Sequence, residues 1–159
     1  MFFKQFYDKH LSQASYLIGC QKTGEAMIID PIRDLSSYIR VADEEGLTIT
    51  HAAETHIHAD FASGIRDVAI KLNANIYVSG ESDDTLGYKN MPNHTHFVQH
   101  NDDIYVGNIK LKVLHTPGHT PESISFLLTD EGAGAQVPMG LFSGDFIFVG
   151  DIGRPDLLE

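Results

Sequence analysis

The sequence predicts an α+β fold built in layers, with many strands and two inserted helices. Three features support this prediction. Strand-like runs recur along the chain, two segments repeat apolar residues at helical spacing, and turn residues separate these segments. The chain has 159 residues, of which 42% are hydrophobic, so it can form one domain with a substantial core.

The first half of the chain is predicted to hold a hairpin followed by alternating helices and strands. Lys22-Thr23-Gly24 makes the hairpin turn. The first helix begins at Asp34, which offers an N-cap, and ends at Gly46. The predicted elements are strands at 15–21 and 25–30, a helix at 34–46, a strand at 47–55, a helix at 62–73 and a strand at 75–80.

The second half is predicted to be almost entirely β. A polar loop at 81–96 comes first, and a further loop lies at 131–136. The predicted strands lie at 103–116, with a turn at Gly107-Asn108, then at 123–130 and at 140–150. Helices on only part of a sheet would leave apolar surface bare, and "PDLLE" resembles the start of another element. We therefore expect the natural chain to continue beyond Glu159.

Composition excludes several classes of protein. The net charge is −11, with 22 acidic and 11 basic residues, which argues against a general binder of nucleic acid or of anionic membranes. Cys20 is the single cysteine, so no internal disulfide can form, and this suits a cytoplasmic protein. The start resembles no signal peptide, and no run of about 18 apolar residues predicts a membrane span.

The stretch "THIHADF" at 55–61 predicts a metal site. In an extended segment His56, His58 and Asp60 point to the same side, at the carboxyl end of a predicted strand. Neutral imidazole and carboxylate groups are ligands for zinc, iron or manganese. The alternative is a polar loop in which Asp60 caps the helix that follows.

A second motif, "HTPGHTPES", follows another predicted strand. Pro117-Gly118 predicts a type II turn that presents His119 and leaves His115 in the strand. Taken alone, the motif also fits a turn that carries two surface histidines.

The third motif, "FSGD", ends another predicted strand. Gly144 allows close approach of the backbone, and Asp145 supplies a carboxylate, although a Gly-Asp pair after a strand is often only a turn. The order of the motifs strengthens the prediction of a metal site, since each donor group lies where a strand gives way to a loop.

Together, "THIHAD", "HTPGHTPES" and "FSGD" resemble the metallo-β-lactamase superfamily in order and spacing, over most of the chain. The resemblance implies an αβ/βα sandwich with metals at one edge between the sheets. The family domain is longer, so 1–159 would be its N-terminal and central part. In the two-metal hydrolases of the family, His56, His58 and His119 would bind one metal, Asp60 and the next residue the other, and Asp145 would bridge them.

Phe61 departs from the hydrolase pattern. Hydrolases of the glyoxalase II type have a histidine there, and Phe61 offers no lone pair, so we expect one metal. The resemblance to the persulfide dioxygenase branch implies one Fe(II) held by His56, His119 and Asp145, with zinc as the alternative. His58 would then orient ligands or water, as would Asp60. That branch commonly keeps the histidine too, so Phe61 argues against a two-metal hydrolase more than for a dioxygenase.

The predicted function is therefore iron-dependent oxidation of a low-molecular-weight thiol persulfide by O₂, giving sulfite and the thiol. The alternatives are a zinc thioesterase of the glyoxalase II type and a non-catalytic, metal-stabilised fragment. "GDIGRPD" resembles a Gly-Arg-x-Asp stretch of the dioxygenase branch, so Arg154 would bind a substrate carboxylate, unless it pairs with Asp156. No nucleophile is predicted, and Cys20 is expected to be buried. The branch also implies a fused rhodanese-type domain, while a homo-oligomer is left open.

Overall fold

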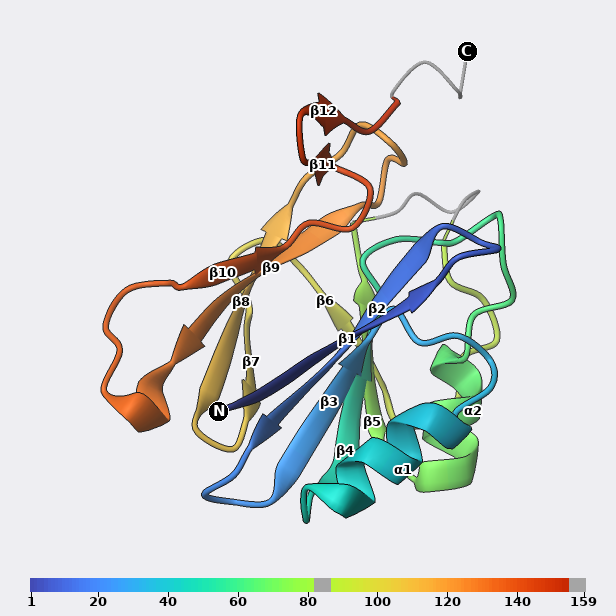
Figure 1. Cartoon of the computed structure of the whole chain (residues 1–159). Coiled ribbons are helices and arrows are strands. Elements are labelled where there is room, and N and C mark those ends of the chain that lie inside the picture. The colour runs from blue at the N-terminus through green and yellow to red at the C-terminus, as the bar shows by residue number, and fades with distance from the viewer. Residues whose placement is uncertain (82–86, 155–159) are drawn as a thin grey trace.

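The computed structural model describes residues 1–81 and 87–154. Two helices, a six-stranded sheet and a four-stranded sheet form successive layers (Figure 1). The first sheet has strand order β1-β2-β3-β4-β5-β6, antiparallel up to β3 and parallel from β3 to β6. Its strands are β1 (Phe2–Asp8), β2 (Gln13–Cys20), β3 (Glu25–Ile29), β4 (Thr48–Ala53), β5 (Asn75–Ser79) and β6 (Thr95–Val98).

The second sheet is antiparallel and has the order β10-β9-β8-β7. A small hairpin follows it near the C-terminal end (Figure 1). The sheet contains β7 (Asp103–Val106), β8 (Ile109–His115), β9 (Ile124–Asp130) and β10 (Gly140–Phe142), and a 3-10 turn (Glu131–Ala133) precedes β10. The hairpin consists of β11 (Ile147–Phe148) and β12 (Asp151–Ile152). The predicted turn at Gly107-Asn108 is confirmed, since it joins β7 to β8.

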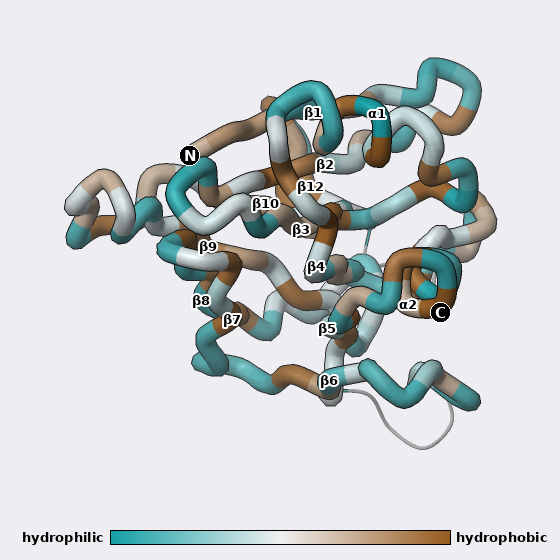
Figure 2. Tube along the Cα trace, turned by 90° about the horizontal axis from the view of Figure 1, so that it is seen from below, coloured by the Kyte–Doolittle hydropathy of each residue, from teal (hydrophilic) through white to brown (hydrophobic). Residues whose placement is uncertain are grey.

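Strands β2 and β3 of the first sheet bury residues on both of their faces. Leu17 and Ile28 point into the core beneath the helices, whereas their neighbours Ile18 and Met27 point into the core between the two sheets. Successive strand residues face opposite sides, so a strand buried on both faces needs a continuous apolar run, as "YLIGC" and "AMII" provide. Figure 2 shows hydrophobic stretches within both sheets and hydrophilic stretches along peripheral loops.

The helices cover the outer face of the first sheet. They are α1 (Ser36–Glu44) and α2 (Ile65–Leu72), and both predicted apolar stripes are confirmed, with Tyr38 and Val68 fully buried. Asp34 accepts the Ser36 N–H at 3.0 Å, but the N-cap position is Leu35 and no side chain caps the helix, so the predicted N-cap at Asp34 is wrong by one residue. At α2 the Ser63 hydroxyl accepts the Ile65 N–H at 3.0 Å, but the N-cap position is Gly64 and no side chain caps the helix, so the alternative role of Asp60 as a cap is wrong.

Three local predictions need correction. β1 was not predicted, because its side chains are half-buried or exposed and show no clear alternation. β6 lies partly inside the predicted polar loop at 81–96, because the outer strand of a sheet can be polar where it faces water. The strand predicted at 140–150 is divided, since β10 ends at Phe142 and the chain turns before β11.

The strands near the C-terminal end carry exposed apolar side chains. Leu141 of β10 is 43% exposed and Ile152 of β12 is 64% exposed. Across residues 1–81 and 87–154, no helix has the length and apolar character needed to cross a membrane.

Candidate metal centre

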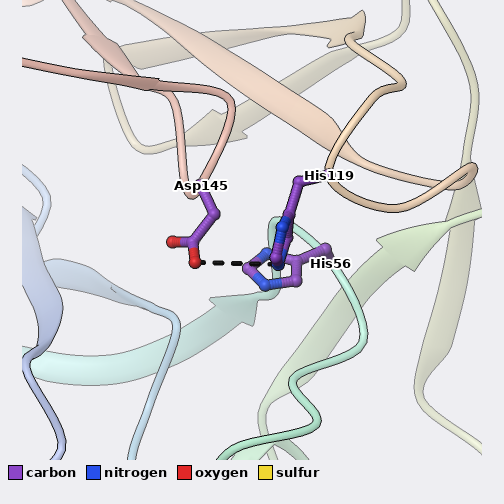
Figure 3. A group of neighbouring side chains, drawn as sticks. All are labelled: His56, His119 and Asp145. Atoms are coloured by element: carbon purple, nitrogen blue, oxygen red, sulfur yellow. Dashed lines mark ion pairs between the residues drawn. The ribbon is translucent and has the colours of Figure 1, made fainter. Parts of the chain in front are cut away.

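Three side chains meet at the edge between the two sheets. His56 follows β4, His119 lies between β8 and β9, and Asp145 lies between β10 and β11 (Figure 3). One ligand atom from each residue lies within 4.8 Å of the others. His119 Nε2 is 3.7 Å from Asp145 Oδ2, and the His56 and His119 rings are 4.9 Å apart and nearly perpendicular. The fold thus brings together the three residues that the sequence predicts as the ligands of one metal.

Hydrogen bonds from the neighbouring strand orient His56. The Thr55 N–H donates to Asp30 Oδ1 at 2.7 Å, and the Thr55 hydroxyl donates to Asp30 Oδ2 at 2.9 Å. His56 Nδ1 is 3.0 Å from the same hydroxyl oxygen. Because the hydroxyl proton is already used, the imidazole must donate from Nδ1, which leaves the Nε2 lone pair free. That tautomer suits metal binding through Nε2.

The two histidines of the first motif have different environments. Burial lowers the pKa of His56, and the charge of nearby His58 lowers it further, so His56 favours the neutral form that a metal requires. Burial also acts to lower the pKa of His58, but the hydrogen bond and charge of Asp30 outweigh it, and the net shift is upward. His58 Nε2 lies 3.2 Å from Asp30 Oδ1. This pairing suits the predicted orienting role of His58.

The motif is not extended along its whole length, because the chain bends after β4 at 55–56 and again at 59–61. The His56 and His58 rings still approach to 4.1 Å, but Asp60 is exposed and lies apart from the three-residue cluster. Phe61 packs against His58 with ring centroids 4.4 Å apart. The position after Asp60 is therefore filled by an aromatic ring.

A cavity of about 470 Å³ opens beside Asp145. His58, Asp60 and Phe61 form part of its wall. Its other aromatic and carboxylate groups include Tyr7, Tyr16, Phe148 and Asp30. The cavity therefore adjoins the candidate metal ligands and has both apolar and acidic walls.

Two glycines hold the Asp145 loop in place. Gly144 has a φ of 50°, a left-handed conformation that favours glycine. A Cβ on Gly144 would also overlap the Thr55 side chain, and one on Gly153 would overlap the Asp145 carbonyl oxygen. The loop that carries the third ligand is thus packed directly against the residue that orients the first.

The second motif behaves largely as predicted. His115 is the last residue of β8, and its Nε2 donates to the Pro121 carbonyl at 2.9 Å, so its ring bonds within the loop. The type II turn is wrong, because Gly118 has a φ of 153° rather than about 80°. The chain bends at 118–120 instead and still presents His119.

Arg154 is exposed and comes two residues after β12, so its predicted contact with substrate stays a prediction. Asp156, its alternative partner, lies outside the described residues. Cys20 is buried, as predicted.

Three buried carboxyl groups around the site were not predicted from the sequence. Asp30 binds Thr55 and His58, as described above. Glu122 Oε1 accepts the Ile57 N–H at 2.9 Å, and burial raises the pKa of Glu54 to about 7. Asp30 could have been found, because "IIDP" places it directly after a buried strand, as "FSGD" places Asp145. Spacing gives no comparable signal for Glu54 or Glu122.

Comparison with known proteins relates this geometry to a family. Residues 9–158 match the model of the metallo-beta-lactamase superfamily. A hydroxyacylglutathione hydrolase from Rhodospirillum rubrum is 31% identical over 140 residues, which cover 87% of this chain and 49% of that protein. The mitochondrial persulfide dioxygenase ETHE1 of Bos taurus is 26% identical over 161 residues, covering 98% and 56% respectively.

A solved structure agrees in fold. The crystal structure of ETHE1 from Myxococcus xanthus has a TM-score of 0.80 and 33% identity, covering 99% of this chain and 63% of that one. This chain spans about half the length of the curated relatives it matches. The αβ/βα sandwich and the predicted family are thereby confirmed, and the chain belongs to the metallo-beta-lactamase superfamily.

Proposed function

We propose that this chain is the metal-binding part of an iron-dependent persulfide dioxygenase. The observation that carries the proposal is the cluster of two histidines and one aspartate, His56, His119 and Asp145. Such a set is typical of mononuclear ferrous sites that leave positions open. The similarity to ETHE1 proteins in sequence and in fold supports the same reaction.

The donor set fits a single ferrous ion. His56 has a free Nε2 lone pair and a lowered pKa, while Asp145 supplies one anionic oxygen. Bound there, the ion would supply redox activity and adjacent open positions for the persulfide sulfur and O₂. The overall reaction consumes one persulfide, one O₂ and one water, and yields the thiol, sulfite and two protons.

The protein's own residues orient the metal ligands and exclude water from the site. Asp30 fixes the His56 tautomer through Thr55 and pairs with the His58 ring. In our proposal the cavity beside Asp145 binds the thiol that carries the persulfide, and Phe61 excludes water from one wall of this cavity. Arg154 would bind a carboxylate of that carrier. We also propose a cytoplasmic protein that detoxifies sulfide and continues, beyond 1–159, into a rhodanese-type domain.

A zinc thioesterase of the glyoxalase II type is the second candidate. The hydroxyacylglutathione hydrolase from Rhodospirillum rubrum, at 31% identity, favours it. The same three ligands could hold zinc, which acts as a Lewis acid and lowers the pKa of bound water to about 7. Phe61 counts against this candidate, since it supplies no ligand for a second metal.

Oxygen consumption separates the two reactions. The full-length protein, reconstituted anaerobically with Fe(II), should draw down dissolved O₂ in proportion to added thiol persulfide. Zinc-loaded protein should not. Hydrolysis of an acyl thioester without O₂, together with no reaction of persulfide in air, would refute the dioxygenase. Activity in neither assay would favour the non-catalytic fragment.

A further inference from the structure

We infer that Glu122 is a positioning residue that fixes the two histidine-bearing loops relative to each other. The inference rests on the proposed metal site and extends it to a residue outside the ligand set. Glu122 lies three residues after His119 and is 2% exposed, so its carboxyl group is enclosed by protein. It does not belong to the cluster of candidate ligands.

The key contact crosses from one loop to the other. Glu122 Oε1 accepts the backbone N–H of Ile57 at 2.9 Å. Ile57 stands between His56 and His58, so this one bond fixes the peptide on which both rings depend. A second bond, from the Ile124 N–H to the Thr55 carbonyl at 2.8 Å, joins the same two segments.

Together with the contacts of Asp30, these two hydrogen bonds hold the segment of His56 from both sides. On one side, Asp30 holds Thr55, and Thr55 orients His56. On the other side, Glu122 and Ile124 tie that segment to the loop of His119. The ring centroids of His56 and His119 are 4.9 Å apart. Because the rings sit on different sheets, their separation depends on ties of this kind between the loops.

The contact requires reach more than charge. The donor is a neutral backbone amide, so a carboxamide oxygen of the same length can replace the carboxyl oxygen. Glu122→Gln therefore keeps the bond. Glu122→Asp keeps the charge but is one methylene shorter, so it leaves the Ile57 N–H without its acceptor. If Glu122 acted through its charge alone, the order of the two variants would be reversed.

Cobalt(II) binding to the full-length protein tests this inference, with ligand-field absorption reporting both affinity and coordination geometry. Glu122→Asp should weaken binding about tenfold, as loss of groups that orient ligands typically does, and should alter the absorption bands. Glu122→Gln should bind within about threefold of the wild type, with unchanged bands. Ile109→Ala is the control for stability, since Ile109 is fully buried at the far end of β8 from His115.

The control should lower the stability of the fold and leave cobalt affinity unchanged. The inference would be overturned if Glu122→Asp bound cobalt as tightly as the wild type. It would also be overturned if Glu122→Gln bound as weakly as Glu122→Asp, or if Ile109→Ala lost as much cobalt affinity as Glu122→Asp. Failure of the wild type to bind cobalt would refute the metal site and this inference together. The dioxygenase alone would be refuted if the wild type binds cobalt and the variants follow the expected order of affinity, but the iron-loaded wild type consumes no O₂.

Discussion

Glu54 is expected to make the stability of the metal-free protein depend on pH. It follows β4, and its side chain is 2% exposed. Within the described part of the chain, its Oε1 has no hydrogen-bond partner. Burial raises its pKa from 4.5 to about 7, although a hydrogen bond from Ser63 and the charge of His58 act in the opposite direction. The folded protein therefore keeps a proton that the unfolded chain releases at lower pH.

The sign of the effect follows from linkage. Because the folded pKa is the higher one, the contribution of Glu54 to stability is complete below pH 4.5 and is lost as the pH rises to about 7. At about 1.4 kcal/mol for each pH unit, the loss amounts to roughly 3 kcal/mol. Glutamine has no proton to release. Glu54→Gln should therefore gain about 3 kcal/mol over the wild type between pH 4.5 and pH 8.

Urea denaturation of the chelator-treated protein measures this gain. With a slope of about 2 kcal/mol per molar urea, the midpoint of Glu54→Gln should move up by about 1.5 M relative to the wild type across that pH range. Glu45→Gln, at an exposed position, serves as the control and should show no such change. The reasoning is refuted if the difference between Glu54→Gln and wild type is the same at pH 5 and pH 8.

Two further predictions concern the metal. His119→Ala should abolish binding of one equivalent of Fe(II) or Co(II), measured by elemental analysis, because it removes one of three protein ligands, whereas His115→Ala should leave it nearly intact. Equal losses would show that the loop presents both rings. Phe61→His should restore a donor beside Asp60 and raise the bound zinc above one per chain, towards two; zinc that stays at one would show that Phe61 is not what limits the count.

A metal site could be predicted because each donor motif follows a predicted strand, and the resemblance to the persulfide dioxygenase branch then selected the three ligands among the donors. His56, His119 and Asp145 come at or soon after the ends of apolar strands, and such ends gather at one edge of a sheet. The pairing of His58 with Asp30 could not be predicted from the residues around His58. It depends on Asp30, and the two approach because β3 and β4 pair in parallel, with Ile29 opposite Ala53. Pairing between strands so distant along the chain leaves no trace in local residue patterns.

The layers were predictable for a similar reason. Continuous apolar runs in β2 and β3 indicate burial on both faces, and both cores are observed. The outer strands of the first sheet were not predictable, because β1 and β6 bury few of their side chains and so lack apolar patterning. The Glu122 contact escapes prediction too, since it depends on how the loops of two sheets meet.

The distribution of the three candidate ligands over both sheets has a consequence for biosynthesis. Asp145 is the last of them to leave the ribosome, and its loop reaches His56 only after the second sheet has packed on the first. A metal held by all three residues would therefore bind only after the two sheets have packed, unlike the zinc of small modules that fold around their metal.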